Sequence, residues 1–156
     1  MTFEEQLHST GKLIYTNKGT SMMPLLRAAR DIMVIESCKP SEVKKLDAVL
    51  FVRFWQGKKQ YVLHRVLKVH PDGTFWIVGD HCVSGDTVSG EQILGKLTAV
   101  VRDQKTIKVT DWKYLCYVHL WCDVYPLRFF LLRAKSFARR CLCFLKRRIT
   151  RQLPTT

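Results

Sequence analysis

Four residues of this 156-residue chain have the types and settings that nucleophilic catalysis requires. Such catalysis needs a serine, a base that bonds to the serine hydroxyl, and a group that orients the base. Ser21 lies in the sequence Gly-Thr-Ser-Met-Met-Pro, and His64 lies in an apolar stretch. Asp80 and Asp86 bracket a loop that contains glycine. The pattern predicts a Ser–His–Asp site for acyl transfer and leaves open which aspartate faces His64.

Each residue also has a purely structural explanation. A serine at a helix start is usually a cap, a histidine in a strand is usually a packed side chain, and aspartates are common in turns. His81 is a second candidate base, but we favour His64. Cys82 stands beside His81 and raises the alternative of a metal site with His64 and Asp80, but no further spacing supports it. We therefore expect neither a metal ion nor a cofactor.

The elements that must position these residues are mainly short strands separated by turn signals. A short helix over 22–29 is also expected after Ser21, with Pro24 in its first turn. So many strands in so short a chain favour a closed or folded-over antiparallel sheet. The predicted strands cover residues 12–15, 31–37, 48–54, 60–69, 74–78, 92–101 and 105–109.

Charge divides the chain near residue 111. The net charge is +13, and most of it falls in the last 45 residues, where Asp123 is the single acidic side chain. We expect a β-domain over 1–111 and a basic helical tail over 112–156. Within the tail, residues 127–149 form an amphipathic helix whose basic side opposes an apolar face.

The tail predicts contact with an anionic membrane surface. Packing of its apolar face on the domain is the second interpretation, and nucleic-acid binding is unlikely by comparison. The chain shows no signal peptide and no apolar run of eighteen residues, so we expect a peripheral protein. Irregularly spaced cysteines favour free thiols and the cytoplasmic side. The residues selected as membrane contacts are Phe130, Leu131, Arg139, Arg140, Leu142 and Leu145.

Several short boxes, taken in order, resemble those of type I signal peptidases. They are Ser-Met-Met-Pro at 21–24, Asp-Ile-Met-Val at 31–34, Leu-Asp-Ala-Val at 46–49, His-Arg-Val at 64–66, Gly-Asp at 79–80 with Asp86, and Gly-Lys at 95–96. The resemblance covers about residues 18–101. It implies a small coiled antiparallel β-barrel, here followed by the basic amphipathic tail. His64 stands where bacterial members mostly have a lysine, as in the archaeal and endoplasmic-reticulum branch.

By this resemblance Ser21 is the nucleophile, His64 is the base, and Asp86 orients the imidazole while Asp80 supports the loop. A hydroxyl that the family often places two residues before the nucleophile would fall on Gly19, which has none. The oxyanion hole then depends on the Ser21 N–H and the Thr20 hydroxyl. Losing one such donor typically costs about 10²–10³ in rate, so the resemblance implies a slow enzyme.

The expected function is therefore a serine endopeptidase that cleaves leader or signal peptides after small residues. The alternative is a non-catalytic, membrane-associated peptide-binding module with the same fold. The substrate preference comes from the resemblance alone. All boxes precede residue 102, so we expect residues 127–156 to be dispensable for hydrolysis of a soluble peptide.

Overall fold

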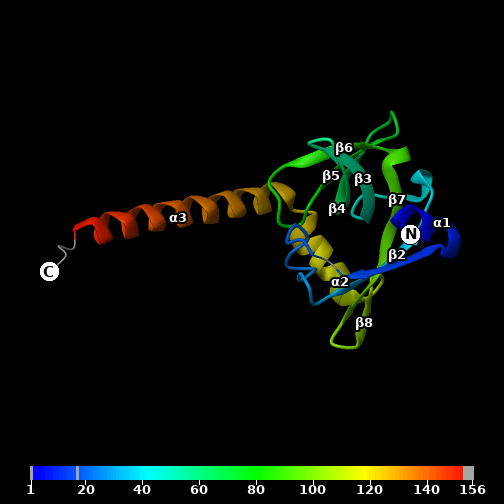
Figure 1. Cartoon of the computed structure of the whole chain (residues 1–156), viewed down its shortest axis with the longest axis horizontal. Helices are drawn as coiled ribbons and strands as arrows, with labels where there is room; N and C mark the ends of the chain where they lie inside the picture. Colours follow the sequence, from blue (N-terminus) through cyan, green and yellow to red (C-terminus); the bar gives the residue numbers. More distant parts are fainter. Residues whose placement is uncertain (1, 17, 153–156) are drawn as a thin grey trace.

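The chain folds into an antiparallel sheet of eight strands followed by two C-terminal helices (Figure 1). The computed structural model describes residues 2–16 and 18–152, without the side chains of residues 136 and 140–152. The strands are β1 (Lys12–Thr16), β2 (Ile32–Ser37), β3 (Ala48–Trp55), β4 (Lys58–Val69), β5 (Thr74–Val78), β6 (Gly85–Ser89), β7 (Ile93–Arg102) and β8 (Lys105–Lys108). The helices are α1 (Phe3–Thr10), α2 (Trp112–Tyr117), its π-helical extension η3 (Val118–Cys122), and α3 (Tyr125–Gln152), with short 3-10 turns η1 (Pro40–Glu42) and η2 (Gly90–Gln92).

The mostly β, antiparallel class is confirmed, but the prediction of a closed barrel is wrong. The strand order is β1-β2-β7-β3-β4-β5-β6, and β8 pairs with β7. Within the described residues, β1 pairs with β2 alone and β6 with β5 alone. The connection from β1 to β2 instead reaches the loop after β5, where the His81 N–H donates to the Ser21 carbonyl oxygen at 2.7 Å. The two edges of the sheet, at β1 and β6, are therefore linked through loops and not by hydrogen bonds between strands.

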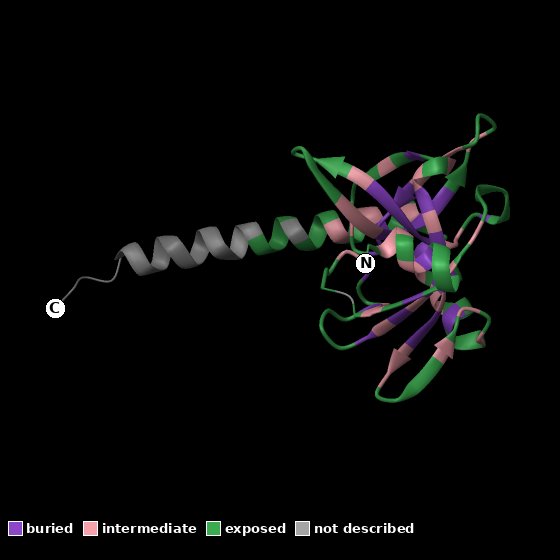
Figure 2. Cartoon of the chain, turned by 45° about the vertical axis from the view of Figure 1, so that its right-hand side comes forward, coloured by how far each residue is buried: buried purple, intermediate pink, exposed green. Residues whose placement is uncertain are grey.

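Both faces of the central strands are buried, as the purple segments of Figure 2 indicate. Ala48 and Leu50 of β3 belong to one apolar cluster, while Val49 and Phe51 belong to another. Successive strand residues point to opposite faces, so β3 supports a core on each side. This explains why its sequence is a continuous apolar run instead of an alternating one.

All seven predicted strands are confirmed within two residues at each end. β6 was not predicted, because Gly85 and Asp86 resemble a turn. Pairing with β5 makes this segment a strand, and a side chain at Gly85 would collide with the Ile77 carbonyl oxygen. α1 was not predicted either, although Thr2 and Glu5 form a capping box there, which is a recognisable N-terminal signal.

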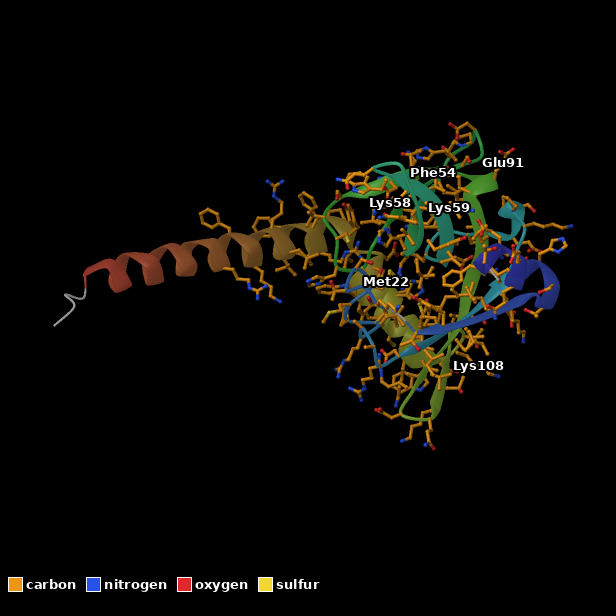
Figure 3. The ribbon with its side chains drawn as sticks, in the orientation of Figure 1. Met22, Phe54, Lys58, Lys59, Glu91 and Lys108 are labelled. Atoms are coloured by element: carbon orange, nitrogen blue, oxygen red, sulfur yellow. The ribbon has the colours of Figure 1, made fainter. Side chains whose placement is uncertain are left out.

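The predicted helix over residues 22–29 is wrong, because the segment after Ser21 forms successive turns. The Asp31 carboxylate accepts the Arg27 N–H at 2.8 Å and also pairs with Arg102. A side-chain acceptor of this kind competes with helical hydrogen bonding. Met22, which is labelled in Figure 3, and Leu26 are fully buried, so the turns are still anchored in the core. Because no helix starts at Ser21, it has no helix N-terminus to stabilise an oxyanion.

The two C-terminal segments differ in their packing. Tyr114, Val118 and Cys122 of α2 and η3 are buried in the same cluster as Leu13 and Leu50 of the sheet. The first part of the expected tail therefore continues the core of the β-domain. In contrast, α3 projects away from the body of the molecule (Figure 1).

The start of α3 docks through one side only. Arg128 is buried and Phe129 is half-buried, whereas Leu127, Phe130 and Leu131 are 57%, 67% and 47% exposed. At 100° per residue, the buried side lies opposite the predicted apolar face. The second interpretation, packing of that face on the domain, is therefore wrong for these residues.

No described helix is by itself long and apolar enough to cross a membrane. Trp112–Cys122 and Tyr125–Arg139 meet the criterion of length and composition only as a pair, with a bend of 70° between them.

Candidate active site

Ser21 and His64 line the same cleft, although 43 residues of chain separate them. The cavity has a volume of about 450 Å³. Ser21 comes from the turns that follow β1, and His64 comes from the middle of β4, opposite Val49 of β3. The fold thus unites the two residues that the sequence analysis selected as nucleophile and base.

His64 is almost fully buried, at 7% exposure, with the Phe51 ring 6.0 Å from the imidazole. Burial lowers the pKa of His64 to about 4, and the negative charge of Asp86 opposes this shift only in part. The imidazole is therefore neutral at pH 7 and free to accept a proton. Its Nδ1 atom is buried without a hydrogen-bond partner among the described residues.

Asp86 is the aspartate that faces His64. Its Oδ2 atom lies 4.0 Å from His64 Nδ1 and 2.9 Å from Nη1 of Arg53. The register of β6 against β5 sets this position, because Asp86 pairs with Ile77. Arg53 therefore holds the carboxylate at a distance from which it can attract a charged imidazolium without a direct hydrogen bond.

Asp80 has a different environment, since it is fully buried and bound to Arg65. Arg65 donates from Nε and Nη2 to the two carboxylate oxygens at 2.8 and 2.7 Å. Asp80 is thus held by Arg65 just after the end of β5. The question that the sequence left open is answered by distance: Asp86 is the aspartate within 4.0 Å of the imidazole.

Gly79 lies where the Ser21 backbone, the His64 ring and the Cys82 side chain come close together. A Cβ atom at this position would lie 2.8 Å from the Ser21 carbonyl oxygen, 3.0 Å from His64 Nε2 and 2.7 Å from the Cys82 sulfur. Real Cβ atoms essentially never approach other atoms below 3.0 Å. Only glycine therefore allows the Ser21 backbone and the His64 ring to come so close to this loop.

The residues expected around the oxyanion are only partly in place. Gly19 lines the cleft, whereas Thr20 is exposed and does not belong to the cleft lining. Lys18, which the sequence analysis did not select, also lines the cleft and brings a positive charge to it. The sequence offered one indication that Lys18 lies at the site, namely its position three residues before Ser21.

The aromatic wall of the cleft was not predicted from the sequence either. Phe3 of α1 packs against Tyr15 and Tyr61, with ring centroids 4.8 and 4.7 Å apart. Glu4 pairs with Lys59 and accepts a hydrogen bond from Tyr61, which holds α1 against β4. A helix that went unpredicted thus supplies one side of the cleft.

The alternative base lies elsewhere. His81 is exposed and lines a groove between its own loop and α3, outside the lining of the Ser21 cleft. Cys82 lines both cavities. No group of three or more His, Cys, Asp or Glu side chains among the described residues is placed to hold a metal ion.

Three of the selected membrane-contact residues, Phe130, Leu131 and Arg139, are exposed on α3. The side chains of the other three, Arg140, Leu142 and Leu145, lie outside the described part of the structure. The free thiols of the described chain are Cys38, Cys82, Cys116 and Cys122.

Comparison of the chain with protein-family models, curated proteins and solved structures finds no match in any of the three.

Proposed function

We propose that the protein is a serine endopeptidase that resembles type I signal peptidases, with Ser21 as nucleophile and His64 as base. The observation that carries the proposal is the shared cleft of Ser21 and His64, with Asp86 on the far side of the imidazole. The order nucleophile, base and acid is the arrangement of a catalytic triad. The likeness of the sequence boxes to the signal-peptidase family supports the same assignment.

The geometry distinguishes the two imidazole nitrogens. Nδ1 faces Asp86, whereas Nε2 faces Gly79 and the Ser21 backbone. In the proposed reaction Nε2 takes the proton of the Ser21 hydroxyl while Oγ bonds to the scissile carbonyl carbon. Collapse of the tetrahedral intermediate breaks the peptide bond, and the same proton passes to the leaving amine. Water then releases the acyl group by the reverse sequence.

Charge accounts for the role of Asp86. The imidazole becomes positively charged when it accepts the serine proton, and burial disfavours that charge. The carboxylate at 4.0 Å offsets part of this cost. Because Arg53 shares the same oxygen, the compensation is smaller than in a directly bonded triad. This agrees with the slow turnover expected from the missing hydroxyl at Gly19.

The cleft walls indicate the kind of substrate. Tyr15, Met33 and Leu50 give one side an apolar lining, while Lys18 and Arg53 carry positive charges. Such a cleft suits an extended peptide with apolar side chains. Cleavage after small residues, and leader or signal peptides as substrates, are part of the proposal on the strength of the family resemblance.

We also propose that α3 lies on an anionic membrane surface, on the cytoplasmic side. Its docking leaves Leu127, Phe130 and Leu131 exposed and turned away from the body. Basic side chains such as Lys135 and Arg139 are exposed on the same helix. Apolar insertion and attraction of basic residues to anionic lipids act together in such helices. A peripheral position fits an enzyme whose relatives by resemblance work at membranes.

The decisive experiment is covalent labelling with a fluorophosphonate probe, which phosphonylates activated serines with loss of fluoride. The intact protein should be labelled, and Ser21→Ala and His64→Gln should not. Ser9→Ala is the matched control, because Ser9 is an exposed serine of α1 that bonds to the Gln6 carbonyl. In peptide hydrolysis, Ser21→Ala should lower kcat by up to about 10⁶-fold.

Two results would lead to different conclusions. Labelling that persists in Ser21→Ala would remove Ser21 from the mechanism. Absence of labelling in the intact protein, together with binding of a peptide in the cleft, would identify the chain as a non-catalytic peptide-binding module.

A further inference from the structure

The loop that follows β5 has two faces, and the C-terminal helices hold one of them. On this face the Tyr117 hydroxyl donates to Asp80 Oδ2 at 2.8 Å, and Trp121 Nε1 donates to the Asp80 carbonyl oxygen at 3.2 Å. The Tyr125 hydroxyl donates to the Val83 carbonyl oxygen at 3.2 Å. Burial raises the pKa of Tyr117 far above its usual value, so its hydroxyl keeps the proton that it donates.

Arg128 of α3 makes the remaining contact on this face. Its side chain is fully buried, with Nη1 3.7 Å from Asp80 Oδ1 and the guanidinium over the Tyr125 ring at 5.0 Å. None of its three guanidinium nitrogens has a hydrogen-bond partner among the described residues. The start of α3 is thus tied to the loop by the charge attraction between Arg128 and Asp80 and by the hydrogen bond from Tyr125 to Val83. Removing one partner of a buried charge pair is costly, because the other charge stays buried.

The opposite face of the loop touches the candidate catalytic residues. The His81 N–H donates to the Ser21 carbonyl oxygen at 2.7 Å, and Gly79 lies against that oxygen and His64 Nε2. Met22, the neighbour of Ser21, is buried in the same apolar cluster as Val118 of η3. The loop is therefore a short bridge between the C-terminal helices and the active site.

We propose that Tyr117, Trp121 and Arg128 are positioning residues, which hold the loop 79–84 against Ser21 and His64. The inference rests on the proposed peptidase function for its catalytic consequence. It places the beginning of α3 within the catalytic unit, although every sequence box ends before residue 102. The dispensable part of the tail therefore starts beyond Arg128.

The bridge also links the membrane helix to catalysis. Arg128 and Leu131 are less than one helical turn apart, and Arg128 is buried beside Asp80 whereas Leu131 is 47% exposed. A displacement of α3 at its lipid-facing side would act on Asp80 through Arg128. The geometry of the catalytic site then depends on the position of α3.

The test uses single substitutions in the full chain. Tyr117→Phe removes one hydroxyl and keeps the ring, while Arg128→Met removes the charge at similar length. Arg128→Lys restores the charge and serves as the rescue variant. Arg30→Met is the matched control, since Arg30 pairs with Asp103 on the surface. We expect kcat for a soluble peptide to fall about 10- to 100-fold in Tyr117→Phe and Arg128→Met, with KM little changed. Arg128→Lys should recover part of the loss.

A second readout separates positioning from a general loss of stability. The groups that face His64 are Arg53 of β3, Asp86 of β6, and Asp80 and Cys82 of the loop, with Lys18 in the same cleft. If the loop moves, water reaches the imidazole, and the pKa of His64 rises toward its ordinary value of about 6.5. An NMR titration of the His64 ring should show this upward shift in Tyr117→Phe and Arg128→Met but not in Arg30→Met.

The outcomes are distinct. Folded Tyr117→Phe with the kcat and His64 titration of the unmodified protein would overturn the proposal, even if Arg128→Met failed to fold. If the unmodified protein hydrolyses no peptide and is not labelled, the peptidase function fails. The His64 titration would still decide whether the helices position the loop.

Discussion

Oδ2 of Asp86 lies 4.0 Å from Nδ1 of His64, a separation set by Arg53, which binds the same oxygen at 2.9 Å. The carboxylate therefore acts on the imidazole through its field and not through a hydrogen bond. Electrostatic compensation at this distance is real but weaker than a direct bond provides. This relationship determines the size of the effects expected at the site.

Replacing Asp86 with asparagine should lower kcat about 10- to 100-fold. A directly bonded triad aspartate costs about 10⁴-fold when it is changed to asparagine, and the longer distance explains the smaller effect. The measurement is steady-state hydrolysis of a soluble peptide at pH 7. Asp72→Asn is the control, because Asp72 caps the exposed turn before Thr74. A loss as large as that of Ser21→Ala would mean that Asp86 also holds the site together.

The dependence of the rate on pH should reflect the buried state of His64. The proposed base works when it is unprotonated, so kcat/KM should fall as the pH drops through the His64 pKa of about 4. The rate should be nearly constant from pH 6 to 8. An unperturbed histidine would give a midpoint near 6.5 instead. A midpoint between 6 and 7 would show that the ring is more hydrated than its burial indicates.

The same group makes stability depend on pH. The folded protein keeps His64 neutral, whereas the unfolded chain takes up a proton below about pH 6.5. The free energy of unfolding should therefore decrease as the pH falls from about 6.5 to about 4, by about 3 kcal/mol from this group, and the effect should level off below. Chemical denaturation of the unmodified protein and of His64→Gln gives the difference. Parallel pH curves would contradict the prediction.

Gly79→Ala should damage the site directly. The added methyl group would lie within 3.0 Å of the Ser21 carbonyl oxygen, His64 Nε2 and the Cys82 sulfur. Overpacking of this kind typically costs about 1–3 kcal/mol of stability, and a displaced Ser21 should lower kcat by more than tenfold. Gly79→Ala combined with Cys82→Ala is the informative comparison. Full recovery in the double variant would show that the sulfur, and not the backbone of Ser21, sets the limit.

Removal of residues 134–156 should sharply weaken binding to anionic vesicles, because most basic side chains of the tail are lost. It should leave hydrolysis of a soluble peptide unchanged, because Arg128 is kept. Binding by the full chain should weaken as salt rises, since screening acts over about 8–10 Å at physiological ionic strength. The apolar face should retain some affinity at high salt. Sedimentation with vesicles of neutral and anionic lipid measures both effects. Binding that ignores salt, or is absent, would contradict the membrane proposal.

The positions of most strands could be predicted from the sequence, because the strand propensity of their residues agrees with the structure that they form. β-branched and aromatic runs bounded by turn signals predicted seven strands. The failures have local causes as well. In β6, Gly85 and Asp86 have turn propensity, and only pairing with β5 makes them a strand. After Ser21, the Asp31 side chain takes the N–H that a helix would use.

The sequence by itself determined which residue types could do chemistry and in what order they occur. Ser21, His64, Asp80 and Asp86 were selected because of their combination and their order in boxes that resemble those of signal peptidases, although each alone has an ordinary structural explanation. Separate roles for the two aspartates were decided only by tertiary structure. Asp80 and Asp86 are six residues apart in one loop and strand, yet one is fully buried against Arg65 and the other faces His64.

The role of the tail was likewise decided in three dimensions. Periodicity placed Arg128 on the polar side of an amphipathic helix, and that side is the one that packs against Asp80. A helical wheel records which residues share a face, but it carries no information on which face meets the rest of the protein. That choice depends on contacts that only the fold creates. The Arg128 guanidinium is buried 3.7 Å from Asp80, a carboxylate that Arg65 and Tyr117 already bind, and a buried charge is tolerated only beside an opposite one.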